Sequence, residues 1–213
     1  MLFATTYIYD RITSALPKEL FTSVLEQFDS AFHVAYRRAN ERADHPEWKE
    51  ILGRERHWNL EVGFREAGLA AGLSFDTAHT IPLGGRYTVL HSPEFVIGRA
   101  KVNAQTDKVR PSKYRSEFAV LNSFVSNRQT DLFMPTPAFY DDRLFGLFVA
   151  GADRHNPAIP AFVRFAIPKH DLNGWVFNQP VEKVIAAYVA PERAIEVIPD
   201  LAKVKIKLRN HRQ

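Results

Sequence analysis

The sequence predicts a single α+β domain, in which an N-terminal helical hairpin packs on a mixed, mainly antiparallel β-sheet. Residues 1–73 place apolar side chains at helical spacing, whereas residues 74–213 hold strand-length apolar runs and a few short helical patterns. The chain has 213 residues, of which 46% are hydrophobic, so one domain with a sizeable core can form. Helices first and strands later favour this class over a doubly wound parallel sheet.

Two long helices are expected in the N-terminal part, after a short strand at residues 5–12, where aromatic and branched side chains favour a strand. The first helix begins at Pro17, because proline is tolerated in a first helical turn. The second helix begins at Pro46 and runs towards Gly72. The apolar stripe of the first helix contains Leu20, Val24, Phe28 and Ala31, and the residues expected on the buried side of the second are Trp48, Ile51, Leu52, Trp58 and Val62.

A β-hairpin within residues 143–177 is expected at the centre of the sheet. Apolar runs at residues 144–150 and 159–167 flank the segment 151–157, which is rich in Gly, Asp, Asn and Pro. The second run alternates between two sets of side chains, so its strand has two different faces. The side chains expected to be buried there are Phe148, Val163 and Phe165.

Shorter patterns complete the expected fold. The remaining elements are strands at residues 86–91, 94–102 and 175–177, and short helices at residues 111–121 and 180–188. Within the second of these strands, Arg99 and Lys101 share one face, and Ala100 and Val102 share the other. Lysine alternates with aliphatic residues at 203–209, which predicts one more strand with one face in water.

The composition also bears on the compartment. The chain has no cysteine, which excludes a disulfide framework, thiolate zinc sites and cysteine nucleophiles, and fits a reducing interior. The N-terminus has no basic opening followed by a long apolar core, so no signal peptide is expected. No window approaches 18 uninterrupted apolar residues. We therefore expect a soluble, cytoplasmic protein with no membrane partner.

The net charge of +4 is concentrated in two basic segments. Residues 99–115 and 203–212 together hold 11 of the 28 Lys and Arg residues but only 1 of the 24 acidic residues. Clustered cations suit nucleic acid, because phosphate neutralisation and counterion release supply much of its binding affinity. An aromatic ring between two cations could also stack on a base. The predicted nucleic-acid-binding residues are Arg99, Lys101, Lys108, Arg110, Lys113, Tyr114, Arg115, Lys203, Lys205 and Lys207.

Each basic segment also has a purely structural interpretation. Segment 99–115 can be a solvated loop whose cations pair with acids of the N-terminal helices. Lysines in the tail strand at residues 203–209 can protect an exposed sheet edge from aggregation without touching any ligand.

Motifs for catalysis or metal binding are weak. His57 and Glu61 lie at i and i+4 on one helical face, but two ligands make no site and the HExxH pattern is missing, so we interpret them as an ordinary surface pair. The acids at 141–142 and the turn residues Asp153 and His155 lie at opposite ends of one strand, about 25–35 Å apart, so no shared site is expected. The sequence contains no phosphate-binding loop, dinucleotide fingerprint or serine-hydrolase motif.

The segment Gln129-Thr-Asp-Leu-Phe133 resembles the short linear motif by which bacterial replication and repair proteins dock on the sliding clamp. The resemblance covers five residues and departs from the motif at Thr130, where leucine is commoner. It implies that Leu132 and Phe133 enter a pocket of the clamp while Gln129 hydrogen-bonds to its backbone.

The sequence therefore predicts an intracellular nucleic-acid-binding protein, bacterial or phage-associated, with neither a cofactor nor a metal site. One alternative is a nuclease-like hydrolase with unassigned catalytic residues, and a divalent metal is expected only in that case. The other alternative is a protein–protein adaptor or inhibitor whose segregated charge steers a partner.

Overall fold

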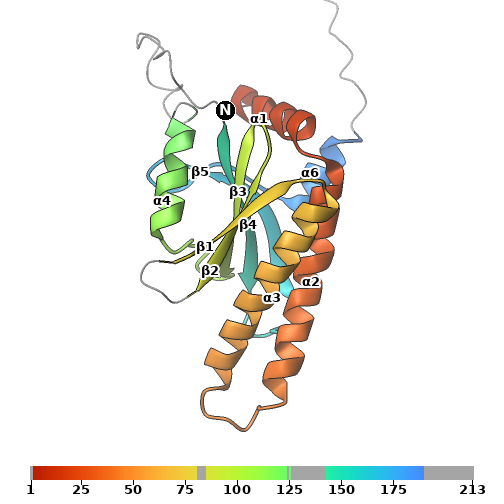
Figure 1. Ribbon diagram of the computed structural model, residues 1–213, viewed down its shortest axis with the longest axis vertical. Coiled ribbons are helices and arrows are strands. Elements are labelled where there is room, and N and C mark those ends of the chain that lie inside the picture. The colour runs from red at the N-terminus through yellow and green to blue at the C-terminus, as the bar shows by residue number, and fades with distance from the viewer. Residues whose placement is uncertain (1, 81–84, 124, 126–142, 190–213) are drawn as a thin grey trace, which may run out of the picture.

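The computed structural model describes residues 2–80, 85–123, 125 and 143–189, and their strands form one mixed sheet (Figure 1). The strands are β1 (Ser74–His79), β2 (Arg86–His91), β3 (Phe95–Asn103), β4 (Leu144–Ala152), β5 (Pro160–Pro168) and β6 (Trp175–Pro180). Their order in the sheet is their order in the chain. β3 and β4 run parallel, and every other neighbouring pair is antiparallel. The predicted α+β class with a mixed, mainly antiparallel sheet is confirmed.

Two long helices confirm the predicted helical hairpin: α2 (Lys18–Asn40) and α3 (Trp48–Ala70), which lie side by side (Figure 1). α2 begins directly after Pro17, whose φ of −71° already suits a first helical turn. Its apolar stripe supplies much of the core, and the fully buried members are Leu20, Phe21, Val24, Phe28 and Phe32.

The first segment of the chain is also a helix, α1 (Leu2–Ala15), so the predicted strand at residues 5–12 is wrong. Ile8, Ile12 and Leu16 are spaced by four residues and are all buried, which is the spacing of one helical face. The strand expectation rested on local side-chain preference, and burial of this stripe against the core outweighs that preference.

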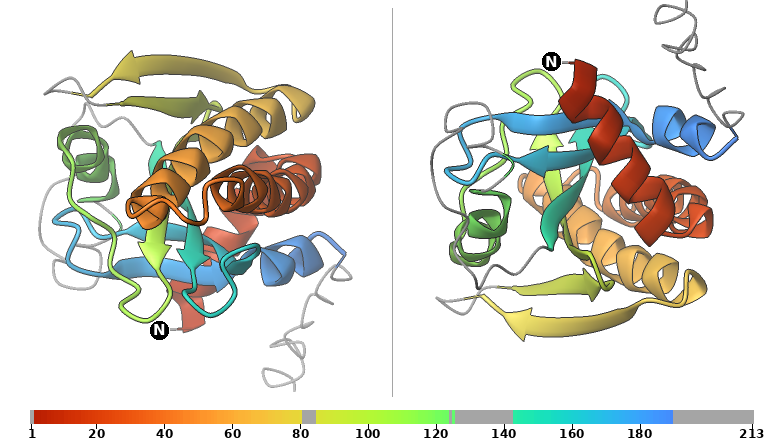
Figure 2. Two further views of the ribbon diagram at one scale, coloured as in Figure 1. Left: turned by 90° about the horizontal axis from the view of Figure 1, so that it is seen from below. Right: turned by 90° about the horizontal axis from the view of Figure 1, so that it is seen from above.

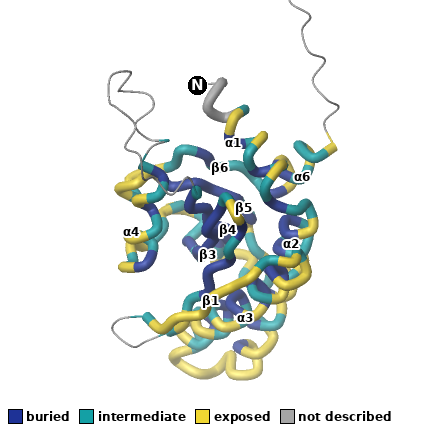
Figure 3. Tube along the Cα trace, turned by 45° about the horizontal axis from the view of Figure 1, so that its top comes forward, coloured by how far each residue is buried: buried dark blue, intermediate teal, exposed yellow. Residues whose placement is uncertain are grey.

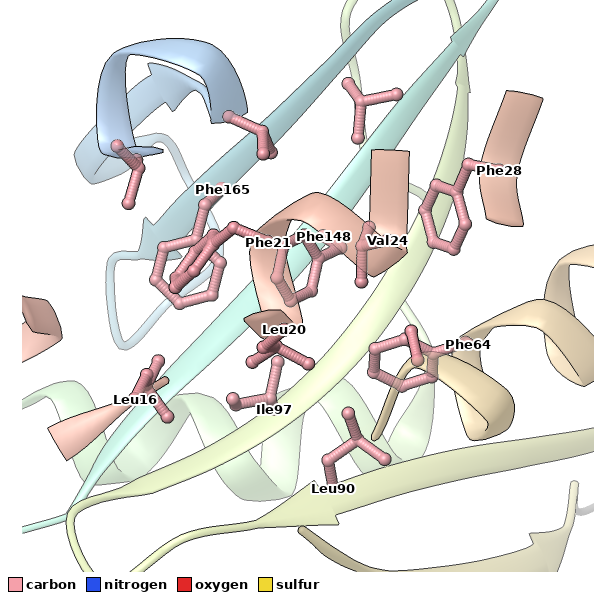
Figure 4. Packing of buried hydrophobic residues seen from close by; sticks show 14 of the residues in the cluster. Leu16, Leu20, Phe21, Val24, Phe28, Phe64, Leu90, Ile97, Phe148 and Phe165 are labelled. Carbon is pink, nitrogen blue, oxygen red and sulfur yellow. The ribbon is translucent and has the colours of Figure 1, made fainter. Parts of the chain in front are cut away.

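The predicted central hairpin is confirmed. β4 and β5 are antiparallel, with Phe148 opposite Phe165. Phe148, Val163 and Phe165 are 0%, 5% and 0% exposed, as expected. Figure 4 shows Phe21 of α2 packed on this pair, and its ring centroid lies 5.5 Å from that of Phe148 and 5.4 Å from that of Phe165. Burial of these large rings joins the helical hairpin to the sheet.

Helices cover both faces of the sheet (Figure 2). α1, α2, α3 and the short helix α6 (Val181–Ala187) share a core with residues such as Phe95 and Ile97 of β3. The short helix α4 (Lys113–Ala119) lies on the opposite face, where Val96 of β3 and Phe145 of β4 are buried. Both short helices agree with the sequence prediction.

Strand β1 lies at the sheet edge and has no hydrophobic alternation that would predict it. All of its residues are exposed, whereas β3 and β4 are largely buried (Figure 3). Its pairing with β2 runs from Ser74 opposite His91 to His79 opposite Arg86. Backbone hydrogen bonding to a buried neighbour therefore defines this strand.

Two predicted segments lie outside the described residues: the tail strand at 203–209 and the clamp-like segment 129–133. Within the described part of the chain, none of the helices is both long and apolar enough to cross a membrane.

Candidate functional site

The candidate site lies where two parallel strands end. Asn103 of β3 is paired with Ala152 of β4, because the carboxyl ends of parallel strands meet at one edge of a sheet. The loops that follow these strands and the first turns of α3 enclose a cavity of about 880 Å³. We call this cavity the basic pocket. It is lined by Trp48, Lys49, Leu52, Arg56, Lys101, Val102, Asn103, Thr106, Lys108, Arg110, Ala152, Asp153, Arg154 and Pro157.

Six of the lining residues are cations, and among the described residues Asp153 is the single carboxylate that lines the pocket with them. Lys101, Lys108 and Arg110 belong to the predicted nucleic-acid-binding set. Lys49, Arg56 and Arg154 do not, and they come from α3 and from the turn between β4 and β5. The fold thus gathers charges that lie as far apart in the sequence as residues 49 and 154.

The cations differ in burial, which divides them into two groups. Arg56 is 7% exposed and Lys101 is partly buried, and we call these two the inner cations. The outer cations are Lys49, Lys108, Arg110 and Arg154, which are all exposed. Exposed long side chains suit screened, adaptable contacts with an anion, whereas buried ones hold a fixed geometry.

Arg56 is held in place by its surroundings. Its Nη2 donates a hydrogen bond to the carbonyl oxygen of Pro157, and its guanidinium carbon lies 4.8 Å from the centroid of the Phe32 ring. Its Nε is buried and makes no hydrogen bond in the described structure. Burial lowers the pKa of Arg56 from its ordinary value, because the charged form loses hydration.

Lys101 projects from β3 towards α3, the helix that carries Arg56. Its Nζ donates a hydrogen bond of 3.0 Å to the carbonyl oxygen of Gly53. Burial, together with the neighbouring charges of Arg56, Arg99 and Arg110, lowers the pKa of Lys101 from 10.5 to about 8. Within the described part of the chain, neither Arg56 nor Lys101 forms an ion pair with a carboxylate.

Arg99, another predicted binding residue, is used inside the protein. It is 5% exposed, and its Nη2 lies 2.5 Å from Oε1 of Glu61. The same Nη2 donates to the backbone oxygen of His57 at 2.9 Å and lies 3.0 Å from Nδ1 of that ring. Burial, together with the charge of Arg99, lowers the pKa of His57, so the neutral ring can accept through Nδ1. We call Arg99, Glu61 and His57 the paired cluster.

The paired cluster corrects the interpretation of His57 and Glu61 as an ordinary surface pair. Glu61 is 8% exposed and forms the ion pair with Arg99. The i, i+4 spacing does place both side chains on one face of α3, but that face packs against the sheet. Helical spacing predicts which residues share a face of the helix. It does not predict whether the rest of the protein packs on that face.

Tyr114 is also occupied. It is 7% exposed, and its ring stacks on Tyr87 with centroids 4.1 Å apart and planes 7° from parallel. The guanidinium carbon of Arg115 lies 5.1 Å from the Tyr114 ring centroid, and the Tyr114 hydroxyl donates to the Arg99 carbonyl at 3.2 Å. In this arrangement Tyr114 has no free ring face on which a base could stack.

The other predicted residues fall outside the pocket. Arg115 is partly buried, and its Nη1 donates a hydrogen bond of 2.6 Å to the Arg110 carbonyl oxygen. Lys113 is exposed, lies 4.0 Å from Glu117 and does not line the pocket. The clamp-motif residues and the tail lysines lie outside the described residues; these are Gln129, Leu132, Phe133, Lys203, Lys205 and Lys207.

The aromatic residue at the pocket is Trp48, the first residue of α3. It is half-buried against a small cluster that contains Ala35 and Ala39, and it also lines the pocket. The sequence prediction placed Trp48 on a buried helix face and did not select Lys49 or Arg56. A usable signal was present, because residues four and eight positions apart on α3 share the face that carries Trp48, Leu52 and Arg56.

Asp153 has a structural role in its turn, where its Oδ1 accepts a hydrogen bond of 3.1 Å from the backbone N–H of His155. Within the described residues no group of three or more His, Asp and Glu side chains is arranged to hold a metal ion. Comparison of the chain with protein-family models, with curated proteins and with solved structures found no match.

Proposed function

We propose that this protein binds nucleic acid through the basic pocket. The observation that carries the proposal is the ratio of charges around one cavity, six cations to one carboxylate among the described residues. A surface of this kind attracts polyanions, and release of condensed counterions from nucleic acid provides the corresponding free energy.

Two further features support nucleic acid as the polyanion. Arginine and lysine occur together, so a planar guanidinium is available for bidentate phosphate contacts and an ammonium for adaptable ones. Trp48 supplies an aromatic surface in the same cavity, and bases stack on such surfaces. A surface that binds an acidic protein through charge alone would not need the aromatic ring of Trp48.

The test compares two triple variants that remove the same charge. The pocket variant carries Lys108→Ala, Arg110→Ala and Arg154→Ala, all exposed outer cations. The control variant carries Lys113→Ala, Lys169→Ala and Lys183→Ala, which are exposed but do not line the pocket. Affinity for a labelled oligonucleotide is measured across a series of salt concentrations for the wild type and both variants.

The pocket variant should lower the slope of log affinity against log salt by about 2–3, since each lost phosphate contact contributes about 0.7–0.9. The control variant should leave the slope within about 0.5 of the wild-type value. Equal effects of the two variants would reject the pocket as the binding site. Absence of oligonucleotide binding by the wild type at low salt would reject nucleic-acid binding itself.

A further inference from the structure

We propose that the inner cations Arg56 and Lys101 form a subsite for the terminal phosphate of a single nucleic-acid strand, with the adjoining base on Trp48. This inference rests on the proposed function and narrows its ligand. It specifies a strand end, rather than a continuous backbone, as the group that enters the basic pocket.

The charge of the inner cations is not balanced by an ion pair within the described residues. Removing a cation from water is unfavourable unless an anion or several hydrogen bonds replace the lost hydration. Within the described residues Arg56 and Lys101 have carbonyl acceptors, Pro157 and Gly53, but no carboxylate. Both side chains line a cavity, so an anion can reach them from outside.

A terminal phosphate is the anion that suits these two cations. A phosphate monoester carries between one and two negative charges near neutral pH and three strong acceptor oxygens. It therefore offers more charge to two neighbouring cations than an internal phosphodiester, which carries one. Arg56 retains a buried Nε–H without a hydrogen-bond partner in the described structure, and charged hydrogen bonds from arginine to phosphate are among the strongest in proteins.

The burial of Arg56 favours a strand end over an internal phosphate. Arg56 is 7% exposed, so the group that reaches it must project into the cavity. An internal phosphate has chain on both sides and fits the exposed outer cations, whereas a terminal phosphate can enter with the strand leaving past them. The volume of about 880 Å³ lies within the usual range of small-molecule pockets, so it can hold a terminal nucleotide.

The aromatic ring of Trp48 provides a surface for the base that adjoins the terminal phosphate. Trp48 lines the same cavity, and stacking on its indole requires a base that is not already stacked within a duplex. The sequence predicted Trp58 and Val62 on the buried side of α3, but they are 56% and 43% exposed. Trp58 does not line the basic pocket and therefore offers a matched control on the same helix. Trp48→Ala and Trp58→Ala therefore remove the same side chain from inside and outside the proposed subsite.

The experiment measures the affinity of the full chain for one single-stranded oligonucleotide with a 5′-phosphate, with a 3′-phosphate or with hydroxyls at both ends. A covalently closed circular strand of the same composition serves as the end-free probe. We expect one phosphorylated end to bind at least tenfold tighter than the hydroxyl and circular forms. Lys101→Met should abolish that preference while weak binding through the outer cations remains, and Lys101→Arg should restore part of it.

Trp48→Ala should weaken binding of the phosphorylated strand about tenfold or more, and Trp58→Ala should change it less than twofold. Equal affinity for phosphorylated, hydroxyl and circular strands would overturn the terminal-phosphate subsite and leave the proposed function intact. Equal effects of the two tryptophan variants would show that the base does not stack on Trp48.

Inorganic phosphate distinguishes a strand end from a free anion. The affinity of inorganic phosphate is measured by its competition with the phosphorylated strand. If inorganic phosphate binds as tightly as that strand, the site binds free phosphate and the strand-end assignment is overturned. If no oligonucleotide binds, the proposed function fails and the inference fails with it. Circular dichroism of Lys101→Met and its thermal unfolding, compared with the wild type, show that any lost preference occurs in a folded protein.

Discussion

Two groups of buried or partly buried cations lie where α3 packs on β3, and they differ in their partners. In the paired cluster, Arg99 is neutralised by Glu61 and hydrogen-bonded to His57. The inner cations, Arg56 and Lys101, have only backbone carbonyls as polar partners in the described structure, and they face a cavity. The first arrangement has its anion within the protein, whereas the second leaves room for one from outside.

The difference separates a structural charge from a binding charge. Arg99 and Lys101 are two residues apart on β3 and project from the same face of the strand, so sequence position and chemistry hardly distinguish them. The helix above them does, because Glu61 lies over one and the backbone oxygen of Gly53 over the other. A buried charge without an internal counterion lowers the stability of the fold. Such charges therefore mark positions where a bound ligand can act as the counterion.

The largest expected effect is on the paired cluster. Glu61→Gln leaves Arg99 buried without its carboxylate, and breaking such a pair costs about 3–5 kcal/mol of unfolding free energy. Urea denaturation measures this loss. The double variant Glu61→Leu with Arg99→Met removes both charges, and we expect it to recover at least half of the stability. A loss below about 1 kcal/mol for Glu61→Gln would contradict the structural role of the pair.

The next effect is on binding as a function of pH. Lys101 must be protonated to attract a phosphate, and bound phosphate raises its pKa above the free-protein value of about 8. Affinity for a phosphorylated strand should therefore be constant from about pH 7 to pH 8, where the phosphate is already largely dianionic, and fall above pH 8 by up to about tenfold per pH unit. Fluorescence anisotropy across this range measures the fall.

Lys101→Arg provides the control for this pH profile, since arginine stays charged throughout the range. The variant should bind with an affinity that is flat from about pH 7 to pH 9.5. The same decline in both proteins would assign the titration to another group.

A smaller effect is expected on folding stability, which should rise with pH where binding affinity falls. The pKa of Lys101 lies below its ordinary 10.5, so between pH 8 and 10.5 the unfolded chain binds a proton that the folded chain lacks. The wild type should therefore gain stability as the pH rises through this window. Lys101→Met should be more stable than the wild type at pH 7 by on the order of 1 kcal/mol, and should lack the gain.

Thermal unfolding at pH 7 and at pH 9.5 measures both parts of this prediction. A clear loss of stability in Lys101→Met at pH 7 would show that Lys101 belongs with the structural charges. The two groups of cations would then not differ in the way that their partners suggest.

The smallest effect is expected outside both groups. Lys113 is exposed and lies 4.0 Å from Glu117, and exposed pairs at this spacing contribute at most about 0.5 kcal/mol. Lys113→Ala should therefore change neither the unfolding free energy nor the oligonucleotide affinity measurably. A tenfold loss of affinity would extend the binding surface from the basic pocket to α4.

The predicted parts of the fold are those that local pattern specifies. The hairpin of β4 and β5 follows from two apolar runs around a turn, the second of them alternating, and the stripe of α2 follows from apolar residues at helical spacing. The same reasoning gave a wrong prediction for residues 5–12, because a short run of aromatic and branched residues suits either a strand or a packed helix. Strand β1 carries no pattern, since pairing with β2 forms it.

The amino-acid sequence alone determined that Arg99 and Lys101 share a face of their strand and that segment 99–115 is basic. Only the tertiary structure decided that this face lies under α3, that Glu61 neutralises Arg99, and that Arg56 and Arg154 join Lys101 around one cavity. The physical reason is range. Periodicity reports which side chains of one element point the same way, but burial and pairing depend on elements up to a hundred residues distant along the chain, here α3 and the turn after β4.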